Sequence, residues 1–255
     1  MPFPNLKKHL LLAVLFLATL PVFGWLQWQP QGWLDRQLAE QGVGGSVLYS
    51  SVSKSFPGLQ LAGVRFDAAG LNGITFETLK LRPAFSTLLS DTPGLYTRIE
   101  GEGIHAGSVI TAQGNELDFD DIDLTADAGS LSRFDSRLLL LGLSGSLALR
   151  GHILLQADNG LPLDGHVELG WSNPASTLLP AGMQQLHIRL NSAEAEGARI
   201  WNWKIESQPE GMAGEGKIMA GGSDIRQWLL RGKLRSAKDV PEMVLSGTLG
   251  APHWQ

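Results

Sequence analysis

The chain has 255 residues, of which 43% are hydrophobic, so it can build one large domain or two small ones with a sizeable core. Its net charge of −5 provides no basic field to attract DNA or RNA, which argues against a nucleic-acid partner. The chain contains no cysteine, and this excludes disulfides, thiolate catalysis and cysteine-ligated metal centres.

The first part of the chain resembles a membrane anchor. Lys7 and Lys8 precede an apolar run from Leu10 to Leu26, which as a helix spans about 26 Å at about 1.5 Å per residue. We expect a cytoplasmic stretch over 1–9 and a transmembrane signal-anchor over 10–28, with the remaining chain across the membrane. A signal peptide cleaved near residues 22–24 is the alternative, and it also exports the body. Three tryptophans are expected at the membrane interface: Trp25, Trp28 and Trp33.

After the anchor, the pattern predicts a short helical linker over 29–45 and an all-β domain over 46–255. Leu34 and Leu38 lie four residues apart and glycines follow them, as expected of a short helix. From there on, apolar and polar residues alternate in many short stretches separated by Gly, Asn, Asp and Pro, which indicates antiparallel strands. We expect a few short helices, for example after Pro83 and Pro174.

A glycine interrupts the apolar row of several predicted strands. The pattern apolar-x-Gly-x-apolar occurs five times, and its two flanking residues share the face of the glycine. One interpretation is that the glycines let a large sheet bend; the other is that they hollow a groove for an acyl chain or a partner's apolar segment. Either interpretation predicts a strongly curved antiparallel sheet, or an open sandwich, with a hydrophobic concave face. The candidate lining residues are Gly145, Leu147, Gly151, Ile153, Gly165, Val167, Gly232, Leu234, Gly247 and Leu249.

The order of several segments resembles a known family. After the single membrane segment come VSKSFPGLQLAGVRF (52–66), GITFETLKLRPAFSTLLS (73–90), LSGSLALRGHILL (143–155), LPLDGHVELGW (161–171) and MVLSGTL (243–249). In this order the chain is similar to the N protein of the type II secretion system (GspN), and more distantly to the AsmA-like proteins with long sheets.

The resemblance implies a fold, a place and partners, and it implies no catalytic residue. The expected fold is a mainly β, AsmA-like sheet after one transmembrane helix. The expected protein is a non-enzymatic accessory component of the type II protein secretion machinery in the Gram-negative inner membrane. Its single-pass anchor would hold a periplasmic body that contacts other secretion subunits. The alternative is an AsmA-like lipid-binding or lipid-transfer protein that carries phospholipid on the concave face.

Three further clusters have a functional and a structural interpretation. The acidic cluster Asp118, Asp120, Asp121 and Asp123 lacks the spacing of a calcium loop, and a solvated strand face with one bulge is the simpler interpretation. His152, His166 and His187 would form a zinc site only if their strands were neighbours in the right register. Trp201 and Trp203 share one strand face and are expected in the core. We therefore predict no cofactor, no metal and no enzymatic activity.

Overall fold

The computed structural model describes residues 27–40, 47–66, 74–87, 91–133, 136–177, 179–180, 182–195, 198–209, 211–235 and 240–254. The chain divides into two compact units, 1–45 and 46–255. The predicted cytoplasmic stretch and nearly all of the predicted anchor, Trp25 included, lie outside the described residues. Among the residues that are described, none belongs to a helix with the length and apolar character needed to cross a bilayer.

The first unit contains helix α2 (Pro30–Glu40), within the range predicted for the linker. Proline suits the first position of a helix because its missing N–H would have no intrahelical partner there. The ring of Trp33 packs edge-on against Trp28, with 5.4 Å between the ring centroids and 65° between the planes. Trp33 remains 46% exposed.

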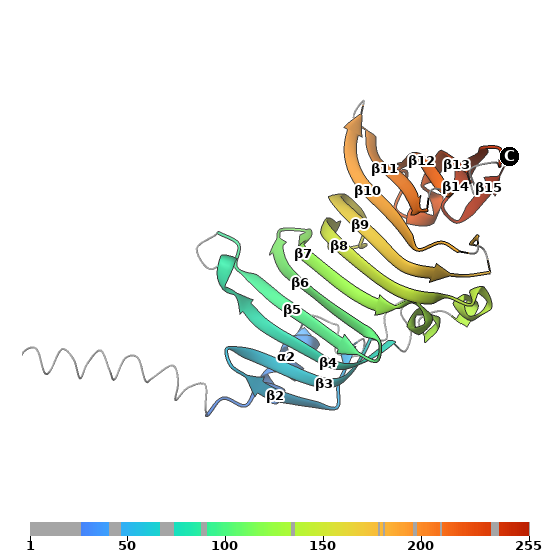
Figure 1. The fold of residues 1–255 in the computed structure, drawn as a ribbon. Helices are drawn as coiled ribbons and strands as arrows, with labels where there is room; N and C mark the ends of the chain where they lie inside the picture. Colours follow the sequence, from blue (N-terminus) through green and yellow to red (C-terminus); the bar gives the residue numbers. More distant parts are fainter. Residues whose placement is uncertain are drawn as a thin grey trace, which may run out of the picture. The chain divides into compact units, whose positions relative to one another are not determined.

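The second unit is one antiparallel sheet of 15 strands (Figure 1). β1 and β2 both pair with β3, and from β3 onward each strand pairs with the next in sequence, so the sheet is a meander without crossovers. The strands are β1 (Val47–Leu48), β2 (Ser51–Ser55), β3 (Gly58–Phe66), β4 (Ile74–Ala84), β5 (Gly94–Gly101), β6 (Ile104–Gln113), β7 (Glu116–Asp127), β8 (Ser144–Gln156), β9 (Pro162–Ala175), β10 (Gln185–Ala195), β11 (Ala198–Gln208), β12 (Ala213–Met219), β13 (Leu229–Arg235), β14 (Met243–Thr248) and β15 (Ala251–Trp254).

The prediction of a mainly β body with one large antiparallel sheet is confirmed. The described residues form a single sheet rather than a sandwich of two. Several strands, β8 to β10 most clearly, bend along their length in Figure 1. Tight turns make the meander possible: Gly114 (φ 59°) joins β6 to β7, and Gly103 (φ 76°) joins β5 to β6. Both turns need a left-handed backbone, which glycine adopts without steric cost.

The described helices of this unit are short 3₁₀ turns. They are η1 (Phe85–Thr87), η2 (Ala128–Arg133), η3 (Ser136–Leu141) and η4 (Ile225–Gln227). The predicted short helix after Pro83 is confirmed in part, since η1 begins two residues later at Phe85, whereas the helix predicted to begin at Pro174 is wrong. Pro83 lies inside β4 opposite Leu95, and Pro174 lies inside β9 opposite an irregularity of β8 between Ser144 and Ser146. A proline is tolerated in a strand where one side lacks a regular ladder, because no backbone N–H is needed there. The pairing of β4 with β3 ends at Leu81, before Pro83, and β8 is irregular opposite Pro174.

Candidate functional site: the apolar face of the sheet

One face of the sheet carries an unbroken row of apolar residues across 13 strands. Each member lies directly opposite the next in the strand register, and residues paired in this way share a face. At about 4.8 Å per strand the row extends roughly 58 Å. We call it the apolar row: Val52, Leu61, Leu79, Ile99, Ala106, Leu124, Leu149, Leu169, Ile188, Ile205, Gly214, Leu234 and Met243.

The face that contains the apolar row is only partly covered. The loop from β7 to β8 folds back onto it, and Ala128 and Leu131 pack there with Ile104, Leu147 and Trp171. Among the large side chains of the described residues, Val64 alone is fully buried. Most members of the row are therefore half-buried, as expected for a sheet that has no second sheet against it.

The predicted lining residues with side chains all lie on this face. Leu147 is 7% exposed and belongs to the cluster under the β7–β8 loop. Ile153 and Val167 occupy the register positions opposite Gly165 and Gly151. Leu234 is a member of the apolar row, and Leu249 packs against the cluster around Trp203.

Four of the predicted glycines are required by the backbone. Gly145, Gly151, Gly165 and Gly247 have φ of 103°, 150°, 142° and 112°, where side-chain-bearing residues are strained. A Cβ on each would also overlap a carbonyl oxygen of the neighbouring strand; for Gly151 and Gly165 these oxygens belong to His166 and His152. These glycines therefore permit close approach of the strands, and their presence is explained without an empty groove.

The fifth predicted glycine, Gly232, is covered by an aromatic ring. The register sets Trp203 opposite Gly216 and Gly216 opposite Gly232, so the three residues form one line across β11, β12 and β13. A Cβ on either glycine would overlap Cζ2 of Trp203 or come within 2.6 Å of it. The indole thus fills the space above both glycines, an arrangement that stabilises glycine-containing strands.

Trp203 organises a small core on the apolar face. Trp203, Leu230 and Leu245 are buried together, and Leu190, Ile205, Ile218 and Leu249 pack around them. Trp201 is 4% exposed, so the expected burial of both tryptophans is confirmed. The indole N–H groups of Trp201, Trp203 and Trp228 are buried, and no acceptor for them occurs among the described residues. The stability of this core therefore comes from packing rather than from indole hydrogen bonds.

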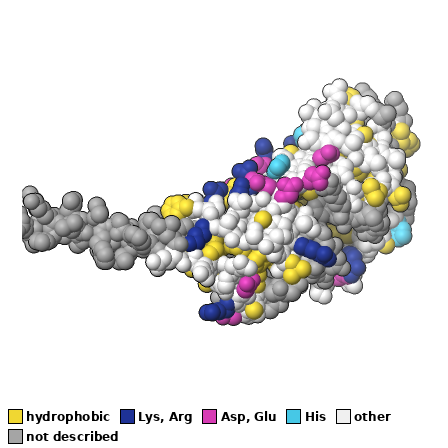
Figure 2. Space-filling model, turned by 90° about the horizontal axis from the view of Figure 1, so that it is seen from below, with side chains coloured by type: hydrophobic (Ala, Val, Ile, Leu, Met, Phe, Trp, Pro, Cys, Tyr) yellow, Lys and Arg dark blue, Asp and Glu magenta, His cyan; other side chains and the backbone are white. Residues whose placement is uncertain are grey.

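The opposite face is polar and carries a row of charges. Asp123, Arg150, Glu168, Arg189 and Lys204 lie opposite one another in successive strands from β7 to β11. Nitrogen–oxygen distances are 3.4 Å for Arg150–Asp123 and 3.2 Å for Arg189–Glu168. In Figure 2 many acidic and basic side chains lie next to one another along the upper margin of the view, and others are scattered over the rest of the surface. Because these pairs are exposed, they favour solubility and register more than stability.

The predicted histidine and aspartate clusters lie on this polar side of the sheet. His152 and His166 are direct cross-strand partners with ring centroids 6.0 Å apart, but His187 lies opposite Gly170, four residues further along β9. Within the described ranges, no three His, Asp or Glu side chains are placed to hold a metal ion. The expected acidic strand with one bulge is confirmed, since β7 continues through the irregularity between Phe119 and Ile122.

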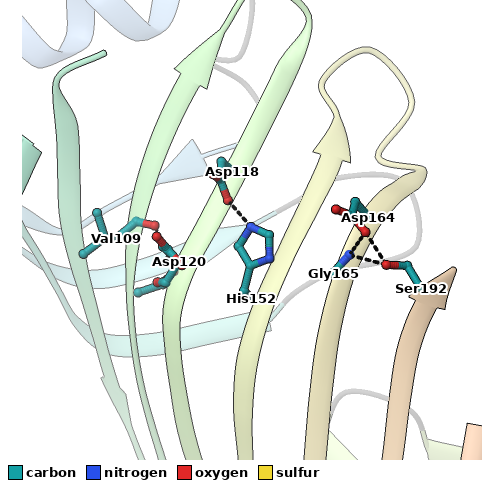
Figure 3. Close-up of polar contacts among 8 residues, drawn as sticks. Val109, Asp118, Asp120, His152, Asp164, Gly165 and Ser192 are labelled. Atoms are coloured by element: carbon teal, nitrogen blue, oxygen red, sulfur yellow. Dashed lines mark hydrogen bonds and ion pairs between the residues drawn. The ribbon is translucent and has the colours of Figure 1, made fainter. Parts of the chain in front are cut away.

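Figure 3 shows the contact between Asp118 and His152 and the hydrogen bonds among Asp164, Gly165 and Ser192. Asp118 Oδ1 lies 2.8 Å from His152 Nε2, within ion-pair distance but not aligned for a hydrogen bond. Asp164 accepts hydrogen bonds from the Ser192 hydroxyl and from the Gly165 N–H, the latter at 2.8 Å. These bonds, the one from Ser192 first, lower the pKa of Asp164 below its ordinary value.

Comparison with known proteins identifies no relative. No family model matches the chain. No curated protein and no solved structure matches it either.

Sequence reasoning did not anticipate three features of this surface. The glycines of β12, Gly214 and Gly216, face the apolar side, and a Cβ on either would crowd Trp203. Ser108 is buried at a bulge of β6 and donates to the carbonyl oxygen of Asp120 at 2.9 Å. The third feature is a pair of cations, Lys217 on β12 and Arg231 on β13, that lie directly opposite each other.

Proposed function

We propose that this protein is a non-enzymatic accessory component of the type II protein secretion machinery, held at the inner membrane by residues 10–28. Its β-domain, 46–255, would lie in the periplasm and contact other secretion subunits. Beyond the segment resemblance, one observation supports the proposal. The apolar row is unbroken, and the described part of the chain places no second sheet against it. A long half-buried apolar surface of this kind is typical of interaction sites rather than of enclosed catalytic pockets.

The apolar face is a better contact surface than the sheet edges. At one edge β1 has two residues and β2 carries Lys54; at the other, β15 has four residues and contains Pro252. Short strands, lysine and proline all disfavour the addition of a further strand. The apolar row, in contrast, offers side chains that a partner can bury.

The proposal is tested by affinity purification of the tagged full chain from detergent-solubilised membranes. We expect secretion subunits to co-purify with the wild type and to be lost from the Leu79→Lys variant, which places a charge in the apolar row. The matched control is Thr78→Lys, because this neighbouring residue of β4 points to the opposite face. Thermal unfolding of each variant checks that it folds. Repeated recovery of the tagged protein alone would contradict the proposal.

A second function, lipid binding or transfer of the AsmA-like kind, is favoured by the length of the same row. A strip of roughly 58 Å can hold acyl chains along its whole length without a closed cavity. This function predicts that phospholipid co-purifies with the full chain and that Leu79→Lys releases it while Thr78→Lys does not. Mass spectrometry of the extracted protein measures the lipid. Lipid without secretion subunits would favour this second function over the first.

A further inference from the structure

The polar faces of β12 and β13 bring two cations together, and the described residues supply no counter-ion for them. Lys217 of β12 and Arg231 of β13 are direct partners in the strand register. Neither side chain forms an ion pair with any residue that the structure describes. Like charges directly opposite each other destabilise a sheet, so this pair has an energetic cost in the free protein.

Two neighbouring cations on this face form ion pairs, whereas Arg235 of β13 forms none with a described residue. Lys204 Nζ lies 2.6 Å from Glu206, and Lys233 Nζ lies 3.5 Å from Glu242. Glu215 is the carboxylate on the same face nearest in register, opposite Lys204 and Lys233, and it forms no ion pair within the described ranges. Among the described residues, Lys217 and Arg231 are therefore two directly opposed cations without a counter-ion, and Glu215 is the one carboxylate that lines the same depression.

These two side chains border an open depression of about 780 Å³. Asn191 and Asn202 stand beside them, Asn202 directly opposite Lys217 in the register. Gly216 and Gly232 also line the depression, where only their backbone atoms are available because the Cα positions that would carry side chains face Trp203 on the other side of the sheet. Met219 and Val244 add apolar contacts, so the depression has room and surface for more than a bare ion.

We propose that this depression binds the phosphate group of an organic phosphate, held by Lys217 and Arg231. The planar guanidinium of Arg231 can donate two parallel hydrogen bonds to phosphate oxygens, and the ammonium of Lys217 supplies a compact positive charge. The Asn202 amide has two further N–H donors. Val244 and Met219 would contact the carbon part of the ligand. A lipid headgroup and a soluble phosphate ester share this chemistry, and the site is independent of the function proposed above.

The test is isothermal titration of the full chain in a maltoside detergent with two probes. Glycerol 3-phosphate represents a soluble phosphate ester, and dihexanoyl phosphatidylglycerol represents a lipid headgroup. We expect saturable binding of at least one probe, weakened about ten-fold or more by Lys217→Gln or Arg231→Gln. Arg150→Gln is the matched control, because it removes the same charge from the same face at a paired residue, and it should change binding less than about two-fold.

The outcomes separate the site from general charge attraction. Tighter binding of the lipid probe would identify a headgroup site, and tighter binding of glycerol 3-phosphate a site for a soluble ester. Equal weakening by Arg150→Gln, or no saturable binding of either probe, would overturn the proposal.

Thermal unfolding without ligand is a second measurement, and it distinguishes a binding role of Lys217 from a structural role. Lys217→Gln relieves the repulsion from Arg231, so without ligand the variant should unfold at the wild-type temperature or slightly above it. In the titration the same variant should bind the probe more weakly. A lower unfolding temperature together with lost binding would assign Lys217 a structural role and overturn the proposal.

Discussion

The indole of Trp203 lies over Gly232, two strands away in the sheet. Gly216 stands between them in the register, and a Cβ at Gly232 would overlap Cζ2 of the indole. The contact exists because both glycines lack side chains. It ties β11, β12 and β13 together on the apolar face and positions Leu230 and Leu245 against the same ring.

A methyl group at Gly232 should therefore be costly. Gly232→Ala must displace Trp203 and also approaches the carbonyl oxygen of Glu215 to 2.6 Å, so we expect a loss of about 1–3 kcal/mol in the free energy of unfolding. Urea denaturation measures it. Gly170→Ala is the control, because a Cβ there would meet no atom closer than 3.8 Å, and it should be neutral or slightly stabilising. Equal losses of stability from the two substitutions would show that the packing of Trp203 does not require a glycine at position 232.

Truncation of Trp203 should reveal how much of the stability of this core comes from packing. Trp203→Ala is expected to cost about 3–5 kcal/mol, as for other buried aromatic residues. Trp203→Phe should cost clearly less, because it keeps a ring over the glycines and loses no indole hydrogen bond to a described residue. Urea denaturation of both variants measures the two losses in the free energy of unfolding. A phenylalanine variant as unstable as the alanine variant would contradict the packing account.

The stability of the sheet should depend on pH through Asp164. Its pKa is lowered in the folded protein, chiefly by the Ser192 hydroxyl and also by the Gly165 N–H. The carboxylate therefore contributes stability that is complete above the ordinary Asp pKa of about 3.9 and is lost as the pH falls below that value. Ser192→Ala should raise the pKa of Asp164 toward its ordinary value, as measured by NMR titration. An unchanged pKa in this variant would show that Ser192 is not the cause.

The exposed charge row should contribute little to stability. Arg150 and Asp123 are 76% and 65% exposed, so solvent screens their attraction. A double-mutant cycle with Arg150→Ala and Asp123→Ala should give a coupling energy of less than about 1 kcal/mol. A larger value would mean that the row stabilises the sheet and would remove Arg150 as a neutral control for phosphate binding.

Alternation in the sequence was sufficient to predict antiparallel strands and the burial of Trp201 and Trp203, but it left a single large sheet and an open sandwich as alternatives. The role of the glycines was harder to predict. Gly151 and Gly165 alternate with apolar residues in the sequence, which assigns them to the apolar face. Glycine is required there because the backbone of the neighbouring strand lies close, and that contact depends on the strand register. The cover that Trp203 gives to Gly216 and Gly232 spans three strands and has no local pattern.

The same reason explains the wrongly predicted helix at Pro174 and the missed cation pair. Pro174 resembles the start of a helix when read locally, but β9 continues through it because the partner strand is irregular at that point. Lys217 and Arg231 are 14 positions apart in the chain, and only the pairing of β12 with β13 sets them opposite each other. Sequence periodicity assigns a residue to a face, whereas its neighbours on that face follow from the register.

The central claim is that the apolar row binds a partner, and site-specific photo-crosslinking in intact cells tests it most directly. A photoreactive residue replaces Leu79 or Ile188 of the apolar row, or their neighbours Lys80 and Arg189 on the polar face. We predict that the two apolar positions crosslink to secretion subunits, or to lipid if the second function holds, and that the two polar positions do so far less. Equal crosslinking from both faces, or none from the apolar positions, would contradict the account.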